Sequence, residues 1–182
     1  MRSITASHCQ LEPQTAAHAS EMYSVLADPA IYEFENEPPR SLEQLSIRFA
    51  KLETRASPDG TEQWLNWVIR LPDGHLAGYV QATVLPTGVA FIAYELNSRY
   101  WRKGIGSSAV RAMTAVLSAS YGVHTFIAVL KARNFRSEAL LRHLGFAHGN
   151  ATQQATYRDE PDELVMLRTA AQSAGTATPA AN

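Results

Sequence analysis

Residues 99–109 bring together the chemical groups that an anion site needs. The stretch reads Arg-Tyr-Trp-Arg-Lys-Gly-Ile-Gly-Ser-Ser-Ala and joins an apolar, strand-like run to a helix-like run that begins near Ser107. The first turn of a helix has unpaired backbone N–H groups and the positive end of the helix dipole, which favour a phosphate. Gly104 and Gly106 have no Cβ, so the backbone there can come close to an anion. The stretch therefore predicts a cradle for a diphosphate, built from main-chain amides between Trp101 and Ser107.

Three other interpretations compete with this cradle. Arg99, Arg102 and Lys103 would be merely solvated if the loop were an ordinary glycine turn. Gly104-Ile-Gly-Ser-Ser-Ala109 fits the dinucleotide fingerprint, but a lone match is weak evidence. Seven residues separate it from the preceding strand-like run, and no acidic residue closes the next strand, so a Rossmann site is disfavoured. A nucleotide P-loop is excluded because no Gly-Lys-Ser/Thr follows a spaced glycine.

A second pattern follows this loop. Residues 134–146 read Asn-Phe-Arg-Ser-Glu-Ala-Leu-Leu-Arg-His-Leu-Gly-Phe. Together the two patterns resemble the coenzyme-binding half of the GNAT acyl-CoA N-acyltransferases. The first is similar to their motif A, Gln/Arg-x-x-Gly-x-Gly/Ala, with Trp101 in place of Gln or Arg. Its Tyr-Trp-x-Lys-Gly-Ile-Gly form and the second pattern are similar to the ribosomal-protein N-terminal acetyltransferase branch. The resemblance covers roughly residues 4–168 in element order and is sharp over 91–146.

The resemblance implies acetyl-CoA as co-substrate. It implies that two strands splay apart and that the pantetheine arm lies between them, paired with the backbone of Tyr94 and Leu96. Asn134 would bond to pantetheine as well as cap its helix. The coenzyme-binding residues implied are Tyr94, Leu96, Trp101, Arg102, Lys103, Gly104, Ile105, Gly106, Ser107, Asn134 and Ser137. No Cys/His cluster has the spacing of metal ligands, so no metal is expected.

Acyl transfer from a thioester to an amine needs a donor to the thioester oxygen, a base for the ammonium and an acid for the thiolate. The resemblance implies that the Leu96 N–H faces the thioester oxygen. Most such enzymes use a tyrosine acid at the position that Leu141 occupies here, so the resemblance transfers the acid role to Ser137. Ser137 would alternatively only bond to its own backbone at the helix start.

Glu95 is the candidate base. It lies beside the implied thioester site in an apolar strand, where a charge is costly to bury unless it is paired. Alternation points it to the sheet face opposite Tyr94 and Leu96. A water chain to bulk solvent is an alternative route for the proton, and His124 and His143 are alternative bases.

Residues 31–39 are the candidate acceptor loop. Its sequence, Ile-Tyr-Glu-Phe-Glu-Asn-Glu-Pro-Pro, combines two aromatic side chains with three carboxylates, which would suit a cationic N-terminus or a small amine. A solvated acidic loop is an equal alternative. The expected function is N-acetyl transfer from acetyl-CoA to a primary amine by direct attack in a ternary complex. The alternative is a non-catalytic acyl-CoA-binding or partner-docking module of the same fold.

Composition narrows the class of protein. The chain has 182 residues, 46% of them hydrophobic, and a net charge of −1. We expect one domain over 1–169, with a substantial core, and a disordered tail over 170–182. The lack of a basic excess argues against nucleic-acid binding. With no membrane-length apolar run, no signal-peptide core and Cys9 as the single cysteine, we expect a cytoplasmic protein. A homodimer is left open.

The elements that must position these residues follow from periodicity and punctuation. We expect one strand over 3–11 and helices over 15–26 and from Ser41, where Ser-Leu-Glu-Gln is a capping box. The remaining expected elements are strands over 64–71, 76–85 and 89–96, a helix over 107–120, a strand over 123–130, a helix over 135–144, and strands from 146 and over 164–167. This order predicts an α/β fold with a mixed α+β sheet. The resemblance implies the GNAT fold, with a mostly antiparallel central sheet, splayed at the strand before the glycine loop, and helices on both faces.

Overall fold

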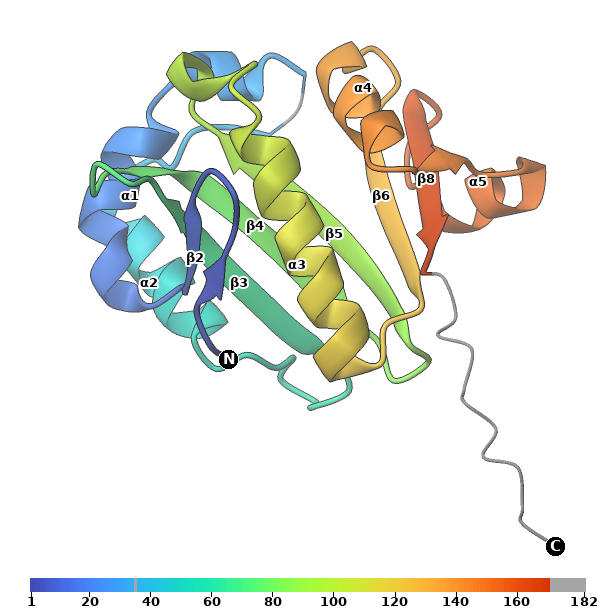
Figure 1. The fold of residues 1–182 in the computed structure, drawn as a ribbon, viewed down its shortest axis with the longest axis horizontal. Coiled ribbons are helices and arrows are strands. Elements are labelled where there is room, and N and C mark those ends of the chain that lie inside the picture. Colours follow the sequence, from blue (N-terminus) through green and yellow to red (C-terminus); the bar gives the residue numbers. More distant parts are fainter. Residues whose placement is uncertain (35, 171–182) are drawn as a thin grey trace, which may run out of the picture.

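A single mixed sheet organises residues 1–34 and 36–170, which are the residues that this computed structural model describes. Its eight strands follow the order β1-β2-β3-β4-β5-β6-β8-β7 (Figure 1). They are β1 (Ile4–Thr5), β2 (Gln10–Pro13), β3 (Gln63–Arg70), β4 (Leu76–Val84), β5 (Val89–Leu96), β6 (Thr125–Lys131), β7 (Ala147–His148) and β8 (Glu163–Thr169). All neighbours are antiparallel except β5 and β6, which are parallel. The predicted mixed, mostly antiparallel sheet is confirmed.

Helices cover both faces of the sheet. They are η1 (Ala16–His18), α1 (Ala19–Leu26), η2 (Pro29–Tyr32), α2 (Leu42–Leu52), η3 (Ser98–Tyr100), α3 (Ile105–Tyr121), α4 (Phe135–His143) and α5 (Ala151–Tyr157). Met22 of α1 and Phe49 of α2 pack with Val68 of β3 in one core, whereas Met113 of α3 packs with Trp67 of β3 in the other. Because neighbouring residues of β3 point to opposite faces, one strand serves both cores.

The N-terminal segment departs from the prediction. The single strand predicted over 3–11 is wrong, because the chain turns back and forms the hairpin of β1 and β2. The Ala6 N–H donates to the Cys9 carbonyl at 2.9 Å and closes the turn. At the tip, the His8 N–H donates to Ser108 Oγ of α3 at 3.3 Å. Local periodicity does not encode this contact with a helix a hundred residues further along the chain.

The first residue of the expected tail, Ala170, is hydrogen-bonded to the chain just before β6. The Ala170 N–H, placed in the expected tail, donates to the His124 carbonyl at 2.8 Å. The rest of the expected tail, 171–182, lies outside the described residues. The antiparallel register of β6 and β8 therefore extends one residue past Thr169.

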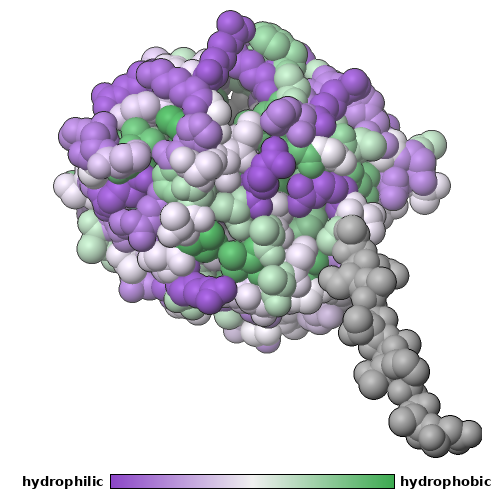
Figure 2. Space-filling model, in the orientation of Figure 1, coloured by the Kyte–Doolittle hydropathy of each residue, from purple (hydrophilic) through white to green (hydrophobic). Residues whose placement is uncertain are grey.

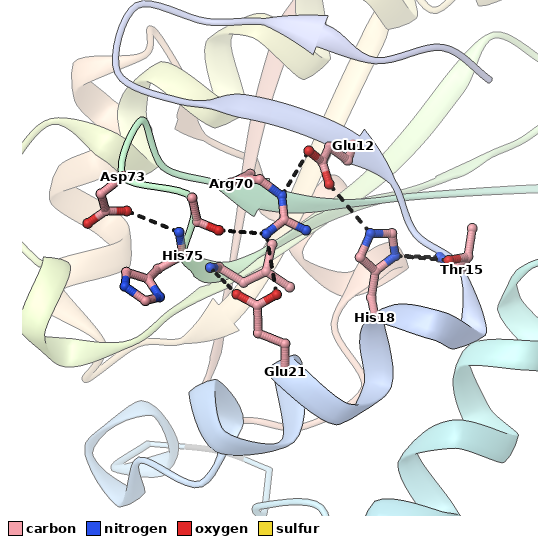
Figure 3. A network of polar contacts seen from close by, with 9 residues as sticks. Glu12, Thr15, His18, Glu21, Arg70, Asp73 and His75 are labelled. Atoms are coloured by element: carbon pink, nitrogen blue, oxygen red, sulfur yellow. Dashed lines mark hydrogen bonds and ion pairs between the residues drawn. The ribbon is translucent and has the colours of Figure 1, made fainter.

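A polar network fixes α1 and the β3–β4 turn against the sheet (Figure 3). Arg70 of β3 is its centre: Nε donates to Glu12 at 2.8 Å, and Nη1 donates to Glu21 at 3.3 Å and to the Gly74 carbonyl at 2.7 Å. The second oxygen of Glu21 accepts from the Leu76 N–H at 2.7 Å. Since these partners come from β2, α1 and the turn before β4, the Arg70 guanidinium holds α1 in position against the sheet.

Candidate active site

The strands β5 and β6 separate along their length. They pair only from Val89 to Phe91 of β5 and from Thr125 to Ile127 of β6, and beyond these residues they diverge (Figure 1). This gap in the sheet is the splay that the family resemblance implied. It lies directly before the loop that leads into α3.

Hydrogen-bond alternation shows which main-chain groups face the gap. The Leu85 N–H donates to the Val89 carbonyl, and the Asn97 N–H to the Ala77 carbonyl, both at 2.9 Å. Both bonds lie in the register that pairs β4 with β5. In an antiparallel ladder, bonded and non-bonded pairs alternate. The odd-numbered residues of β5 therefore bond to β4, and the main-chain groups of the even-numbered residues face β6.

Tyr94 and Leu96 are thus the residues of β5 that present their main chain to the gap. On the other side, the Ala132 N–H donates to the carbonyl of Asp162, the residue just before β8, at 2.8 Å. The same alternation turns the main chain of Val129 of β6 toward β5. Two half-ladders therefore face each other across a space that is open to an additional extended chain.

A cleft of about 930 Å³ occupies this gap and continues to the start of α3. Ten of the eleven predicted coenzyme-binding residues line it, together with Glu95. These ten are Tyr94, Leu96, Trp101, Arg102, Gly104, Ile105, Gly106, Ser107, Asn134 and Ser137. Lys103 is the exception: its ammonium lies 5.8 Å from the centre of the Tyr100 ring. Hydrophilic residues surround the end of the molecule where η2, η3 and α4 lie (Figure 2).

Gly104 begins α3 with left-handed backbone, at φ +74°. Its carbonyl accepts the first bond of the helix, from the Ser108 N–H at 2.9 Å. The N–H groups of Ile105, Gly106 and Ser107 precede that bond and have no carbonyl partner within the helix. All three residues line the cleft. Three main-chain N–H groups without a partner in the helix, at the positive end of the α3 dipole, therefore belong to residues of the cleft wall.

Two contacts that the sequence did not indicate support this loop. The Trp101 indole N–H donates to the Leu96 carbonyl at 2.7 Å, so the loop folds back onto the end of β5. The His8 imidazole lies 3.5 Å from the position that a Cβ on Gly104 would occupy. His8 therefore borders the cradle from the hairpin of β1 and β2, a juxtaposition with no local sequence signal.

The start of α4 closes the gap on the other side. Asn134 Oδ1 accepts from the Ser137 N–H at 3.1 Å, as a helix cap does. The Tyr94 hydroxyl donates to the Ser137 carbonyl at 3.3 Å and links β5 to α4. Burial raises the pKa of Tyr94 to about 12, although the contact with Ser137 opposes the shift. Tyr94 therefore keeps its proton at neutral pH.

Arg136 fastens the acceptor loop across the cleft. Its guanidinium pairs with Glu33 at 2.7 Å. It also lies 4.7 Å from the Trp101 ring centre and 5.3 Å from that of Phe34. Arg133 donates to the Phe34 carbonyl at 3.2 Å. Arg136 of the second pattern and Arg133 just before it thus hold residues of the predicted acceptor loop, which joins the two halves of the site.

The described residues of the candidate acceptor loop do not all face the cleft. Tyr32, Phe34 and Glu37 line the cleft, whereas Glu33 is paired with Arg136. Glu35 lies outside the described residues. Of the two carboxylates of this loop that the structure describes, Glu37 lines the cleft and Glu33 does not.

Glu95 lies on the opposite sheet face from Tyr94 and Leu96, as alternation predicts, and pairs across strands with Tyr79. Burial raises the pKa of the Tyr79 hydroxyl, and the Glu95 carboxylate, which accepts its hydrogen bond, raises it further. Burial and the same carboxylate raise the pKa of Tyr32. Arg48 opposes both shifts. A carboxylate, two protonated phenols and a guanidinium therefore lie close together in the cleft. We call this part of the cleft, beside the candidate acceptor loop, its acceptor end.

The other candidate groups lie elsewhere. His124 contacts the Thr87 carbonyl at 3.1 Å, and neither His124 nor His143 lines the cleft. Cys9 is buried in the core, and burial raises the pKa of its thiol to about 11. Among the described residues, no group of three or more His, Cys, Asp or Glu side chains is placed to hold a metal ion. In that same part of the chain, no helix is both long and apolar enough to cross a membrane.

Asp28 ties the acceptor side of the cleft to the loop before α3. Its Oδ1 accepts from the Ala30 N–H at 3.0 Å in η2, and its Oδ2 accepts from the Ser98 N–H at 2.7 Å in η3. Burial raises the pKa of this carboxyl, but the bonds from Ser98 and Ala30 outweigh it, so the pKa lies below its ordinary value.

We expect Asp28→Ala to destabilise the fold by about 1–3 kcal/mol at pH 7, the usual cost of losing bonds to a charged group. A lowered folded-state pKa contributes stability that is present above the unfolded value of about 3.9 and lost as the pH falls through the folded value. Urea denaturation at pH 7 and pH 3 should therefore show the difference from wild type shrinking in acid. Exposed Glu37→Ala is the control and should change stability by less than about 0.5 kcal/mol at either pH. An Asp28→Ala deficit of the same size at both pH values would contradict the assignment.

Among known protein families, the acetyltransferase (GNAT) domain matches residues 9–147 of this chain. No curated protein matches the chain in sequence. Solved structures match it widely. RimL, a ribosomal alpha-N-protein acetyltransferase in complex with coenzyme A, is 16% identical, with a TM-score of 0.78 over 92% of this chain and 97% of its own.

Two further structures show the same similarity. The ribosomal-protein-S5-alanine acetyltransferase from Vibrio fischeri is 18% identical, with a TM-score of 0.74 over 92% of this chain and 96% of its own. The microcin C7 self-immunity acetyltransferase MccE, in complex with acetyl-CoA and AMP, is 17% identical, with a TM-score of 0.76 over 90% and 93%. At these identities the likeness shows the fold. Since the family profile covers well over half of the sequence, the chain belongs to the GNAT acetyltransferase family.

Proposed function

We propose that this chain transfers the acetyl group of acetyl-CoA to a primary amine, on a protein N-terminus or a small molecule. The observation that carries the proposal is the gap between β5 and β6, whose unpaired main chain leads onto the N-terminus of α3. The two amides of a pantetheine arm can pair there as an added strand. The linked phosphates then meet helix N–H groups and the positive end of the dipole. The ribosomal-protein acetyltransferases among the similar structures support a protein N-terminus as acceptor.

The coenzyme-side roles follow the geometry of the two half-ladders. Tyr94 and Leu96 pair with the pantetheine arm, and the Leu96 N–H donates to the thioester oxygen, where negative charge develops. Arg102 and the amides from Gly104 to Ser107 bind the diphosphate. The Asn134 amide nitrogen remains to donate to the arm, because its oxygen caps α4.

The transfer is a direct attack within the ternary complex. The amine nitrogen attacks the thioester carbon, the carbon–sulfur bond breaks, and an amide and the coenzyme thiolate form. Before the attack, Glu95 accepts one proton from the ammonium at the acceptor end of the cleft. Ser137 donates its hydroxyl proton to the departing thiolate, and the second proton that the nitrogen loses as the amide forms restores that hydroxyl. Cys9 carries no acetyl group, since its thiol is buried, has a raised pKa and does not line the cleft.

The test is acceptor-stimulated release of coenzyme thiol. We expect acetyl-CoA to bind in calorimetry, and a panel of peptides and small amines to include acceptors with a KM of about 1 μM–1 mM. Mass spectrometry should find the acetyl group on the acceptor amine. Binding without stimulated release across the whole panel would contradict the enzyme and favour an acyl-CoA-binding or docking module.

A further inference from the structure

A second, smaller cavity adjoins the acceptor end of the cleft. Its volume is about 280 Å³, and it lies between α2 and the strands β3 and β4. Its lining residues are Arg48, Lys51, Leu52, Trp64, Asn66, Gln81, Ala82 and Thr83. Arg48 and Gln81 also line the main cleft. The two cavities are therefore adjacent, and these two side chains lie at the boundary between them.

The smaller cavity, which we call the side pocket, has the lining of an anion site. Among the described residues that form it, two are cations and none is a carboxylate. The Lys51 ammonium lies 5.7 Å from the Trp64 ring centre, and the Trp64 indole N–H is bonded to Glu62 at 2.9 Å. The Asn66 side chain adds a polar group that is only 6% exposed.

Arg48 differs from the other arginines around the cleft. Arg136 pairs with Glu33, and Arg133 with the Phe34 carbonyl. In the described part of the chain, the Arg48 guanidinium has neither an ion-pair partner nor a hydrogen-bond acceptor. A guanidinium binds carboxylates and phosphates in a two-pronged geometry. Arg48 is therefore available for an acidic group that arrives with the acceptor.

The strand register gives the distance from the reacting centre. Glu95 pairs with Tyr79, and two residues further along β4 Gln81 pairs with Asn66 of β3. A further two residues on, Thr83 pairs with Trp64. These rows share one sheet face, because side chains repeat every second residue. The side pocket thus lies about 7–14 Å from Glu95 along the sheet.

We propose that the side pocket selects acceptors that carry an acidic group about 7–14 Å from the amine, bound by Arg48 and Lys51. In a peptide, whose residues span at most about 3.5 Å each, this group is an acidic side chain at the second or third residue. The placement of the amine at Glu95 rests on the proposed function. The side pocket itself stands on its own lining and charge.

The test compares matched acidic and neutral acceptors. The probes are C-terminally amidated tripeptides with Glu or Gln at the second residue, and the same pair at the third. We expect wild type to favour one Glu peptide over its Gln twin by about tenfold or more in kcat/KM, as for a charge-assisted bond. Arg48→Gln and Lys51→Gln should each bring the kcat/KM values of the Glu and Gln peptides, measured on the same variant, closer together. Arg158→Gln, which removes one positive charge outside both cavities, should keep the preference.

Binding measured by NMR separates this inference from the proposed enzyme. The amide signals of Asn66, Gln81 and Thr83 should shift with the Glu peptide and not with the Gln peptide, even if no thiol is released. Such shifts without release would support the side pocket and contradict the enzyme. Release at equal rates for both peptides, with no selective shift, would overturn the side pocket and leave the enzyme standing. The absence of both thiol release and a selective shift would overturn both the side pocket and the enzyme.

Discussion

Ser137→Ala is expected to lower kcat by about a hundredfold and to leave acetyl-CoA affinity nearly unchanged. The lower end of general-acid effects is expected because a thiol with a pKa near 8.5 is already a good leaving group. The cap of α4 uses the main chain of this residue, whose N–H donates to Asn134, and its carbonyl accepts from Tyr94. Removing the hydroxyl therefore removes the proposed contact to sulfur without removing the cap.

Single-turnover thiol release at saturating acetyl-CoA measures this effect, with calorimetry as the check on binding. Ser137→Thr keeps a hydroxyl and should recover part of the rate. Tyr94→Phe is the matched comparison, because it removes the other hydroxyl near α4 and should cost much less. An unchanged single-turnover rate in Ser137→Ala would rule out the acid role. A large loss in Tyr94→Phe alone would move that role to the phenol.

Gly104→Glu is expected to weaken acetyl-CoA binding by at least about a hundredfold. The new carboxylate stands at the start of α3, where it repels the diphosphate across a short distance. The left-handed backbone, at φ +74°, adds strain of about 1–3 kcal/mol for any side chain.

Gly60→Glu controls for the strain and the charge. Gly60 has nearly the same backbone, at φ +71°, with nothing within 4 Å of its Cβ position. We expect the two variants to lose similar stability, and Gly60→Glu to keep its affinity in calorimetry. Gly106→Val is a second probe, at a position whose backbone is not left-handed. A Cβ at this position lies 3.1 Å from Leu140 Cδ1 on the cleft wall. Wild-type affinity in both cleft variants would overturn the cradle.

The parts of the fold that the sequence predicts well are those whose signals are local. Ser41 caps α2 through its side chain, which accepts from the Gln44 N–H at 3.2 Å. Gly122 ends α3 in left-handed backbone. The turn at Pro72-Asp-Gly74 joins two strands with nearly the predicted bounds. Each of these features depends on residues that are neighbours in the chain.

Two elements of the fold are not predicted from the sequence, α5 and the hairpin of β1 and β2. The sequence predicts no helix over 151–157, yet α5 lies there. A capping box between Asn150 and Gln153 marks the start of α5, but none of its residues is buried, so the helix has no apolar stripe for periodicity to detect. Periodicity predicts one strand in place of the hairpin of β1 and β2, because the tip of the hairpin is bonded to Ser108, which is far away in the sequence.

The candidate site divides in the same way. The anion loop has a motif of its own, and ten of the eleven predicted coenzyme-binding residues line one cleft. The contacts between distant segments have none: Arg136 bonds to Glu33 across the cleft, and Arg48 joins the cleft to the side pocket. Such contacts depend on how the sheet brings its two halves together, which short motifs do not describe.

The gap between β5 and β6 is the feature on which the proposed activity depends. The most direct measurement is a crystal structure of the protein with acetyl-CoA. We predict the diphosphate on the N–H groups from Gly104 to Ser107, and the pantetheine amides bonded to the main chain of Tyr94, Leu96 and Val129. Acetyl-CoA bound elsewhere, or β5 and β6 paired along their full length in that crystal, would contradict the account.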